Sequence, residues 1–413
     1  MSNEHEHRSH QHKKHRHYDR KQLIRRDIIR NVVFSVVIIG AAFALVFLMD
    51  YLDSNRDDPV EVTPPTNVVE QQQTTTTTVP EEEELSTLPL PKETYAYVGQ
   101  PITFYFLNLT GYNSLEDIQV EVNTGGKGKV YEDRWEYTPT KAETIEFEFI
   151  ARNKKGTVVS EGTCVIKVKD CSKEDNLTML VIGDSTISGG YETEYLLDFA
   201  EEDNFDITLL GTQTTPYLNN PYNRHEGRGG WRAEHYLTKS GFDGLINPFY
   251  NPTDRAFDFR YYMESQWYAD VDCVCIQLGI NDVFSAKNDK TLDETYMPAY
   301  IENMQSIINS IHEYDPDIKV IWHMILPGST DEQKFMNAYQ MSQTGARYKR
   351  NTYLVNLEII KIAENMENVY VVPTNAVLNT GTMAASSHGA VHPGKQGYEE
   401  IATQLYSYIR AIN

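Results

Sequence analysis

The chain has 413 residues and a formal net charge of −22, a length that allows more than one domain and a sizeable core. The charge is uneven, because residues 1–30 hold nine Lys/Arg against four Asp/Glu and the acidic excess lies after them. An acidic body of this kind repels phosphate backbones, which excludes nucleic acid as a partner.

Residues 1–30 form a basic, His-rich segment that we expect to be a cytoplasmic tail. Six of the twelve histidines lie in the run HEHRSHQHKKHRH. They lack the fixed spacing of a metal site, so a solvated tail is preferred over metal binding. The sequence predicts no metal and no other cofactor.

A transmembrane anchor is expected at residues 31–50. The stretch 32–49 reads VVFSVVIIGAAFALVFLM and contains no charged residue, which is close to the length that a membrane-spanning helix needs. Arginines precede it and aspartates follow it, so the positive-inside bias places everything after residue 50 outside the cytoplasm. A cleaved signal peptide is the alternative, and it is less favoured because no small-residue cleavage site follows. The sequence thus predicts a single-pass protein of the cell membrane.

Residues 51–91 are expected to be a disordered linker. They contain the runs QQQTTTTTVP and EEEE with scattered prolines. A segment of this composition cannot bury enough apolar surface to fold.

Residues 92–171 are predicted to form a small β-sandwich. Short alternating segments such as ITFYFLNL, TIEFEFIA and TCVIKVK are divided by turn signals such as NTGGKG and RNKKG. The segment resembles the immunoglobulin-like modules of bacterial surface proteins. It is interpreted as a spacer or a weak glycan binder, with the spacer preferred. The sequence leaves open whether Cys164 and Cys171 pair.

Residues 175–413 alternate between apolar runs and longer amphipathic patterns. The apolar runs are TMLVIG (178–183), DCVCIQLG (272–279) and IKVIWHMIL (318–326), and helical spacing appears in 297–311 and 398–409. This alternation indicates a parallel sheet covered by helices on both faces, with sites at the carboxyl ends of its strands. Cys273 and Cys275 are expected as buried thiols on one face of a strand.

Four polar blocks stand out in this part of the chain. They are IGDST with Ser185, GRGGW with Gly230, GIND with Asn281 and VHPGKQGY with His392. Each has an ordinary interpretation: a helix cap for the serine, a positive φ for the glycine, a turn for GIND and a helix start for the histidine. All four falling in order at strand ends favours catalysis instead.

The residue types suit the hydrolysis of an ester. A serine hydroxyl becomes a useful nucleophile only when a neighbouring base takes its proton, and imidazole suits that exchange near neutral pH. Attack on the ester then places negative charge on the carbonyl oxygen, which prearranged N–H donors stabilise.

The ordered blocks resemble the SGNH hydrolase family, the GDSL-type esterases and acylhydrolases, over residues 176–413. The resemblance implies a three-layer α/β/α fold with a five-stranded parallel sheet. It also implies that Ser185 is the nucleophile, that His392 is its base, and that the Ser185 and Gly230 N–H groups and the Asn281 amide form an oxyanion hole. Gly230 is favoured over Gly229 because the family's glycine directly precedes the residue that opens the next helix.

Two aspartates are assigned supporting roles, and one expected aspartate is missing. Asp184 follows the first strand directly, and Asp282 is expected to brace the loop around Asn281. The family usually carries aspartate three residues before its histidine, where this chain has Gly389. We therefore predict a Ser-His dyad, in which a backbone carbonyl or a carboxylate from elsewhere orients the imidazole.

The substrate is expected to be an acylated carbohydrate or a related small ester, with acetyl as the preferred acyl group. Aromatic residues are frequent between residues 231 and 262. They either present rings to sugars or, in the preferred interpretation, are buried in the core. An O-acyltransferase acting on cell-envelope glycan is the first alternative. A noncatalytic surface glycan-binding protein is the second.

Overall fold

The computed structural model describes residues 87–170, 176–215, 218, 220–340, 342–384 and 389–413, and all of them belong to one compact unit, Pro80–Asn413. The expected tail (1–30), the expected anchor (31–50) and most of the expected linker (51–91) lie outside these residues. Among the helices of the described ranges, none has the length and apolar character needed to cross a membrane.

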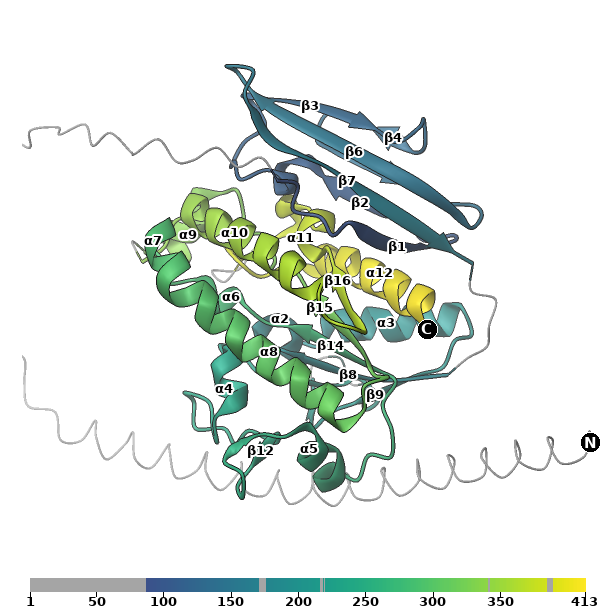
Figure 1. The fold of residues 1–413 in the computed structure, drawn as a ribbon, viewed down its shortest axis with the longest axis vertical. Coiled ribbons are helices and arrows are strands. Elements are labelled where there is room, and N and C mark those ends of the chain that lie inside the picture. Colours follow the sequence, from purple (N-terminus) through teal and green to yellow (C-terminus); the bar gives the residue numbers. More distant parts are fainter. Residues whose placement is uncertain (1–86, 171–175, 216–217, 219, 341, 385–388) are drawn as a thin grey trace, which may run out of the picture. The chain divides into compact units, whose positions relative to one another are not determined.

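The first described region contains two β-sheets (Figure 1). Buried side chains from both sheets form one hydrophobic core. The larger sheet contains, in order, β1 (Glu93–Tyr97), β7 (Val158–Lys169), β6 (Glu143–Asn153) and β3 (Ile118–Asn123). The smaller contains β2 (Ile102–Tyr105), β5 (Arg134–Tyr137) and β4 (Lys129–Val130). Alternate residues of β6 are buried, and the rings of Phe104 and Phe147 meet at 4.9 Å between the sheets. The immunoglobulin-like assignment of this sandwich stays a prediction.

One segment of the sandwich differs from the expectation. The run ITFYFLNL was expected to be a single strand, but it ends at Tyr105 and continues as a 3-10 helix, η1 (Phe106–Leu109). The helix is explained by its packing, because it buries Asn108, whose side chain donates to the Leu378 carbonyl at 2.7 Å. A tertiary contact of this kind overrides the local preference for a strand.

The sandwich packs directly against the α/β part of the chain. Ala376 and Val377 of helix α11 (Thr374–Val377) are buried in the sandwich core. Lys349 of the α/β part is buried and donates to the Leu107 carbonyl at 2.9 Å, and burial lowers the pKa of its ammonium group to about 7. The two parts therefore form one packed structure. Whether the sandwich is a spacer or a glycan binder stays a prediction.

A mostly parallel sheet forms the centre of the α/β part. Five parallel strands follow one another in the order β9 (Ile207–Leu210), β8 (Leu177–Gly183), β14 (Cys273–Gln277), β15 (Lys319–His323) and β16 (Val369–Val372). Two more strands extend the sheet: β11 (Arg224–Gly227) pairs with β8 in parallel, and β10 (Gln213–Thr214) pairs with β11 in antiparallel fashion. The sheet thus has seven strands where five were expected, because β9 pairs with the amino half of β8 and β11 with its carboxyl end.

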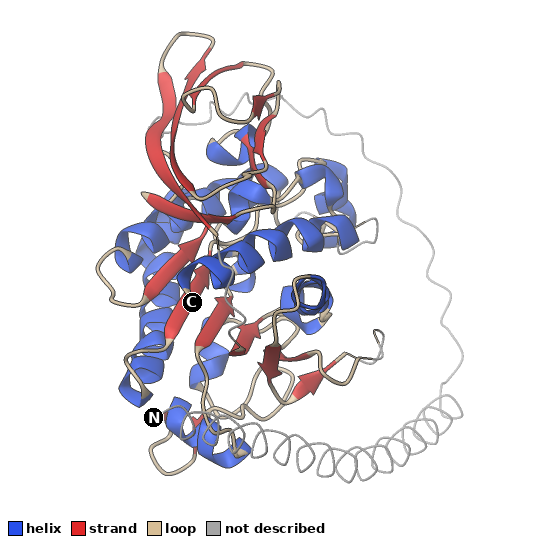
Figure 2. Cartoon of the chain, turned by 90° about the vertical axis from the view of Figure 1, so that its right-hand side faces the viewer, coloured by secondary structure: helices blue, strands red, loops and turns tan. Residues whose placement is uncertain are grey.

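Helices cover both faces of this sheet and make three layers (Figure 2). One face carries α4 (Ala233–Leu237), α5 (Phe259–Gln266), α8 (Met297–Tyr314) and α10 (Gly345–Ala363). The other carries α3 (Tyr191–Glu202) and α12 (Lys395–Ile412). The helices expected at 297–311 and 398–409 are confirmed as α8 and α12. Cys273 and Cys275 are confirmed as buried thiols on the α3–α12 face, and Cys164 is also buried, whereas Cys171 lies outside the described residues.

The remaining elements are short. They are α2 (Ser185–Ser188), β12 (Tyr250–Asn251), β13 (Ala256–Phe257), α6 (Ile280–Val283), α7 (Asp289–Thr291), the π-helical turn η2 (Leu292–Tyr296), α9 (Glu332–Tyr339) and η3 (Thr380–Thr382). Two of them, α2 and α6, start directly beyond the carboxyl ends of β8 and β14, where the sequence predicts the site.

Candidate active site

Ser185 lies at the turn between β8 and α2. The turn is tight because Gly183 has no side chain, and a Cβ there would collide with Ile187. Asp184 caps α2: its Oδ1 accepts from the Thr186 N–H at 2.9 Å and from the Thr186 hydroxyl at 2.8 Å. This capping holds Ser185 as the first residue of the helix, and its side chain remains partly exposed.

His392 meets Ser185 although 207 positions separate them in the sequence. The Ser185 Oγ and the His392 Nε2 are 2.7 Å apart, which is hydrogen-bonding distance. His392 lies in the segment before α12, which is held by backbone bonds from Ala384 N–H to the His392 carbonyl at 2.9 Å and from Gly394 N–H to the Thr382 carbonyl at 2.7 Å. The predicted nucleophile and base are thus brought together in a geometry that permits proton transfer.

The GRGGW block is positioned by β11. Gly227 of this strand pairs with Gly183, and a Cβ on Gly227 would lie 2.5 Å from the Ser188 backbone nitrogen, so only glycine allows this approach. The preceding Glu226 is buried and accepts from the Arg228 guanidinium at 2.7 Å and from the Tyr262 hydroxyl at 2.9 Å. A buried ion pair with this additional hydrogen bond fixes the loop that follows.

Gly230 has a φ of +74°, which favours glycine, whereas Gly229 is not in the left-handed region. Within the described part of the chain, neither the Gly230 N–H nor the Ser185 N–H donates to another group. Both N–H groups therefore remain available to a bound molecule.

Asn281 and Asp282 connect the GIND block to the GRGGW block. Both lie on α6, and the Asn281 amide donates to the Trp231 carbonyl at 2.9 Å. Asp282 Oδ1 accepts from the Ala233 N–H at 3.0 Å, at the start of α4. Burial raises the pKa of the Asp282 carboxyl to about 7. Asp282 thus links α6 to the start of α4.

Ser185, Gly230 and Asn281 share one edge of the sheet. In the strand register Gly183 pairs with both Gly227 and Gln277, so β8, β11 and β14 end at the same level. The serine, the glycine and the asparagine follow these strands. A hydroxyl with a basic partner and several N–H donors at one sheet edge is an arrangement able to attack a carbonyl carbon and stabilise the resulting oxyanion.

A buried polar group behind the turn was not foreseen from the sequence. Glu192 of α3 and His323 of β15 have no exposed surface, and the Glu192 Oε1 lies 3.9 Å from the His323 Nδ1. Burial raises the pKa of the Glu192 carboxyl to about 8 and lowers the pKa of His323 to about 3. Asp184 is buried nearby, and burial raises the pKa of its carboxyl to about 6. The signal in the sequence was a single histidine, His323, inside the apolar run IKVIWHMIL (318–326).

His388 and Gly389 precede His392 in the sequence. His388 lies outside the described residues, and Gly389, at the position of the family's usual aspartate, is buried. Among the side chains that the structure describes, no group of three or more His, Cys, Asp or Glu is arranged to hold a metal ion.

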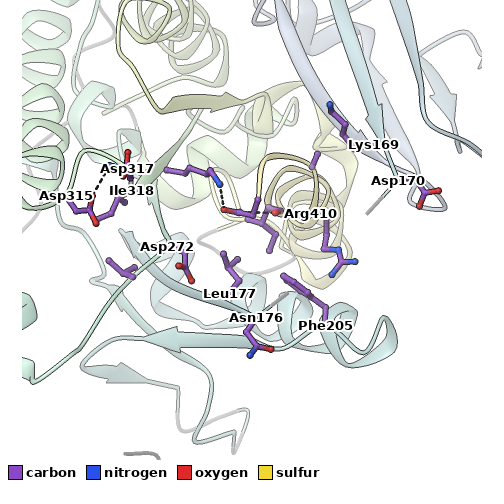
Figure 3. Close-up of a pocket in the computed structure, with 15 residues that line it drawn as sticks. Lys169, Asp170, Asn176, Leu177, Phe205, Asp272, Asp315, Asp317, Ile318 and Arg410 are labelled. Atoms are coloured by element: carbon purple, nitrogen blue, oxygen red, sulfur yellow. Dashed lines mark hydrogen bonds between the residues drawn. The ribbon is translucent and has the colours of Figure 1, made fainter. Parts of the chain in front are cut away.

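A pocket also lies at the opposite edge of the sheet (Figure 3). It is lined by residues at the amino ends of β8, β14 and β15, among them Leu177, Asp272 and Lys319, together with the end of α12. Lys319 donates to the Asn413 side chain there at 2.9 Å. This pocket does not include Ser185 or His392.

The fold and site define a class: an α/β/α protein with a hydrogen-bonded Ser-His pair at the carboxyl edge of its sheet. Among solved structures, the chain is similar to a Clostridium thermocellum family 3 carbohydrate esterase, with 17% identity, 56% of this chain and 94% of that chain covered, and a TM-score of 0.37. It is similar to a carbohydrate esterase family 3 protein from Talaromyces cellulolyticus, with 17% identity, coverages of 56% and 96%, and a TM-score of 0.34. A carbohydrate acetylesterase family member from Sinorhizobium meliloti shows 13% identity, coverages of 57% and 97%, and a TM-score of 0.35.

No curated protein matches the chain. Residues 181–400, more than half of the chain, match the GDSL-like lipase/acylhydrolase family. The match contains all four sequence blocks. The chain belongs to this family, and it is a serine hydrolase that acts on ester bonds.

Proposed function

We propose that this protein is an extracytoplasmic esterase that removes short acyl groups, acetyl above all, from carbohydrate, with Ser185 and His392 acting as a dyad. The observation that carries the proposal is the 2.7 Å contact between the Ser185 hydroxyl and the His392 ring. It supplies a nucleophile together with the base that activates it.

In the first half of the reaction, the Ser185 Oγ attacks the ester carbonyl carbon while its proton passes to the His392 Nε2. The tetrahedral intermediate then collapses, its bond to the alcohol oxygen breaks, and the alcohol leaves with the proton from His392. In the second half, His392 takes a proton from water, the hydroxide attacks the acyl-serine, and the carboxylic acid leaves as Ser185 regains its proton.

Three donors are assigned to stabilise the negative charge of both tetrahedral intermediates: the Ser185 N–H, the Gly230 N–H and the Asn281 amide. The Asn281 amide has two N–H bonds, and the one given to the Trp231 carbonyl orients the group while the other remains for the oxyanion. Donors fixed before the reaction lower the barrier because they need no reorganisation when the charge forms.

Asp184 and Asp282 are proposed as supporting residues. Asp184 caps the helix that begins with Ser185, and Asp282 bonds to the start of α4 beside the Asn281 contact. Their buried positions and backbone hydrogen bonds support a role in holding the site rather than in proton transfer.

The choice of carbohydrate rests on the predicted outward position of the domain. A tethered esterase facing away from the cytoplasm meets the glycan of the cell envelope or of its surroundings. The same Ser-His pair serves an O-acyltransferase if a sugar hydroxyl replaces water in the second half-reaction.

The test is acetate release by the purified full-length protein from acetylated xylo-oligosaccharide and from a chromogenic acetyl ester, with Ser185→Ala as the control. We expect hydrolysis of both substrates without an acceptor sugar, and none by the variant. Acetyl transfer that requires an acceptor sugar would instead indicate the transferase. Binding of glycan without turnover of either ester would indicate the noncatalytic protein.

A further inference from the structure

The aromatic side chains between residues 231 and 262 do not share one environment. Most of them are core, as preferred from the sequence: Trp231, Tyr236, Phe249, Phe257, Phe259 and Tyr262 are buried, and Tyr250 and Tyr261 are half-buried. Phe242 differs from all of these, because 68% of it is exposed. If a ring of this segment contacts substrate from the surface, Phe242 is the one placed to do so.

Phe242 lies against the glycine assigned to the oxyanion hole. A Cβ built on Gly230 would be 2.8 Å from the Phe242 Cζ and 2.9 Å from its Cε1, so the edge of the ring covers the glycine. The Phe242 ring thus lies beside the residue whose N–H is assigned to the ester oxygen.

The ring is carried by a short loop, residues 241–246, that we call the rim loop. The loop closes on itself through the Gly241 N–H, which donates to the Leu245 carbonyl at 3.0 Å. The Trp231 indole donates to the Asp243 carboxylate at 3.2 Å, and Gly241 lies so close to that indole that a Cβ would collide with it. Trp231 directly follows Gly230, so one residue fixes both the rim loop and the glycine.

The surface of the rim loop is apolar but open. Leu245 is 55% exposed and Ile246 is 75% exposed, beside Phe242. Lys239, Ser240 and Asp243 are exposed in the same stretch of chain. A long acyl chain on this surface would keep most of its area in water, which favours an enclosed channel instead. A pyranose ring suits an open surface, since its C–H faces are apolar and its hydroxyls point outward to polar neighbours.

We propose that Phe242 determines the specificity of the enzyme by stacking on the sugar ring of the substrate while the ester carbonyl is held at Gly230. This inference rests on the proposed function and assigns the alcohol side of the ester to the rim loop. Phe242 contacts substrate without taking part in proton transfer. Its removal therefore acts on sugar esters and spares esters of simple alcohols.

The experiment compares Phe242→Ala and Phe242→Trp in the full-length protein on three esters: methyl acetate, methyl butyrate and acetylated methyl xylopyranoside. For Phe242→Ala we expect kcat/KM on the sugar ester to fall about ten-fold, the loss expected when the burial of one ring face is removed, mostly through KM. We expect a change below about two-fold on methyl acetate, and near-complete retention in Phe242→Trp. Trp267→Ala is the matched control, because Trp267 is also largely exposed, at 76%, but precedes the amino end of β14, at the far edge of the sheet.

Four results overturn the inference. An equal loss on methyl acetate and on the sugar ester shows that the ring supports Gly230 and does not recognise sugar. A changed ratio of butyrate to acetate places the acyl group, not the sugar, at the ring. If the wild type prefers the sugar ester but Phe242→Ala loses no activity on it, only the role of Phe242 is overturned. If the wild type does not prefer the sugar ester, the carbohydrate part of the proposed function is overturned as well.

Discussion

Two histidines at the carboxyl edge of the same sheet have opposite surroundings. His392 is partly exposed, and its Nε2 lies 2.7 Å from the Ser185 hydroxyl. His323 is fully buried, and its Nδ1 lies 3.9 Å from the Glu192 carboxyl, which is too far for a hydrogen bond. Burial keeps both members of the second pair neutral near pH 7, because it lowers the pKa of His323 to about 3 and raises that of Glu192 to about 8.

The difference shows which features a reactive pair requires. A base must pass between neutral and charged forms during each turnover. Ser185 and His392 are partly exposed and lie within hydrogen-bonding distance of each other, as the proposed dyad requires. His323 is completely buried and has no hydrogen-bond partner among the residues that the structure describes, which makes its charged form too costly. Proximity of a histidine to an oxygen therefore does not by itself define a site.

The largest effect on activity is expected for the Ser185–His392 pair. Ser185→Ala and His392→Ala should each lower kcat by at least about 10⁴-fold, because nucleophile and base act as a unit. The double variant should be no worse than either single one. Because both side chains are partly exposed, the free energy of unfolding should change by less than about 1 kcal/mol in urea titrations. Losses that multiply in the double variant would show that the two residues act independently.

The next largest effect is expected for Asn281. Asn281→Ala removes the amide assigned to the oxyanion, and we expect kcat to fall about 10²-fold with KM little changed, a loss of about 3 kcal/mol in transition-state stabilisation. Steady-state kinetics on a chromogenic acetyl ester measures both constants. A rise in KM at constant kcat would instead assign Asn281 to ground-state binding.

The buried Glu192–His323 pair should affect the stability of the fold rather than the catalytic rate. The folded-state pKa of Glu192 is raised to about 8 from its ordinary value of 4.5, so the folded protein holds a proton that the unfolded chain releases in this window. Its contribution to stability is complete below pH 4.5 and is lost as pH rises to 8.

Glu192→Gln keeps the shape of the side chain without this titration. We expect the variant to be more stable than the wild type by roughly 2–4 kcal/mol at pH 8, with a smaller difference at pH 5, in denaturant titrations. Its kcat at pH 7 should stay within about two-fold of the wild type. Parallel pH profiles of stability for both proteins would contradict the assigned burial of Glu192.

A third histidine gives the smallest expected effect. His388 lies four residues before His392 and carries no negative charge with which to orient it. We expect His388→Ala to change kcat by less than about two-fold, measured beside His392→Ala on the same ester. A loss comparable to that of His392→Ala would mean that the base has been assigned to the wrong histidine.

Much of the central fold could be predicted because its signals are local. The apolar runs at β8, β14 and β15 and the helical spacing of α8 and α12 each lie within one continuous stretch. Ser185 and His392 could be paired because four blocks occur in a fixed order. The burial of Cys273 and Cys275 followed from their alternation in an apolar strand.

Other features depend on contacts between distant segments and were not predictable. The strands β10 and β11 have two and four residues, too few for a periodic signal. The 3-10 helix η1 depends on the hydrogen bond from Asn108 to Leu378. The Glu192–His323 pair forms only when α3 and β15 come together. The exposure of Phe242 among buried rings is set by the rim loop, which composition does not reveal.

The central claim is that His392 activates Ser185, and covalent labelling by a fluorophosphonate tests it most directly. Such a reagent reacts with an activated serine, and the modified residue is located by peptide mass spectrometry. We predict a single label on Ser185 of the folded wild type, and a labelling rate at least about 10³-fold lower in His392→Ala. A label on another residue, or an unchanged rate on Ser185 in His392→Ala, would contradict the claim.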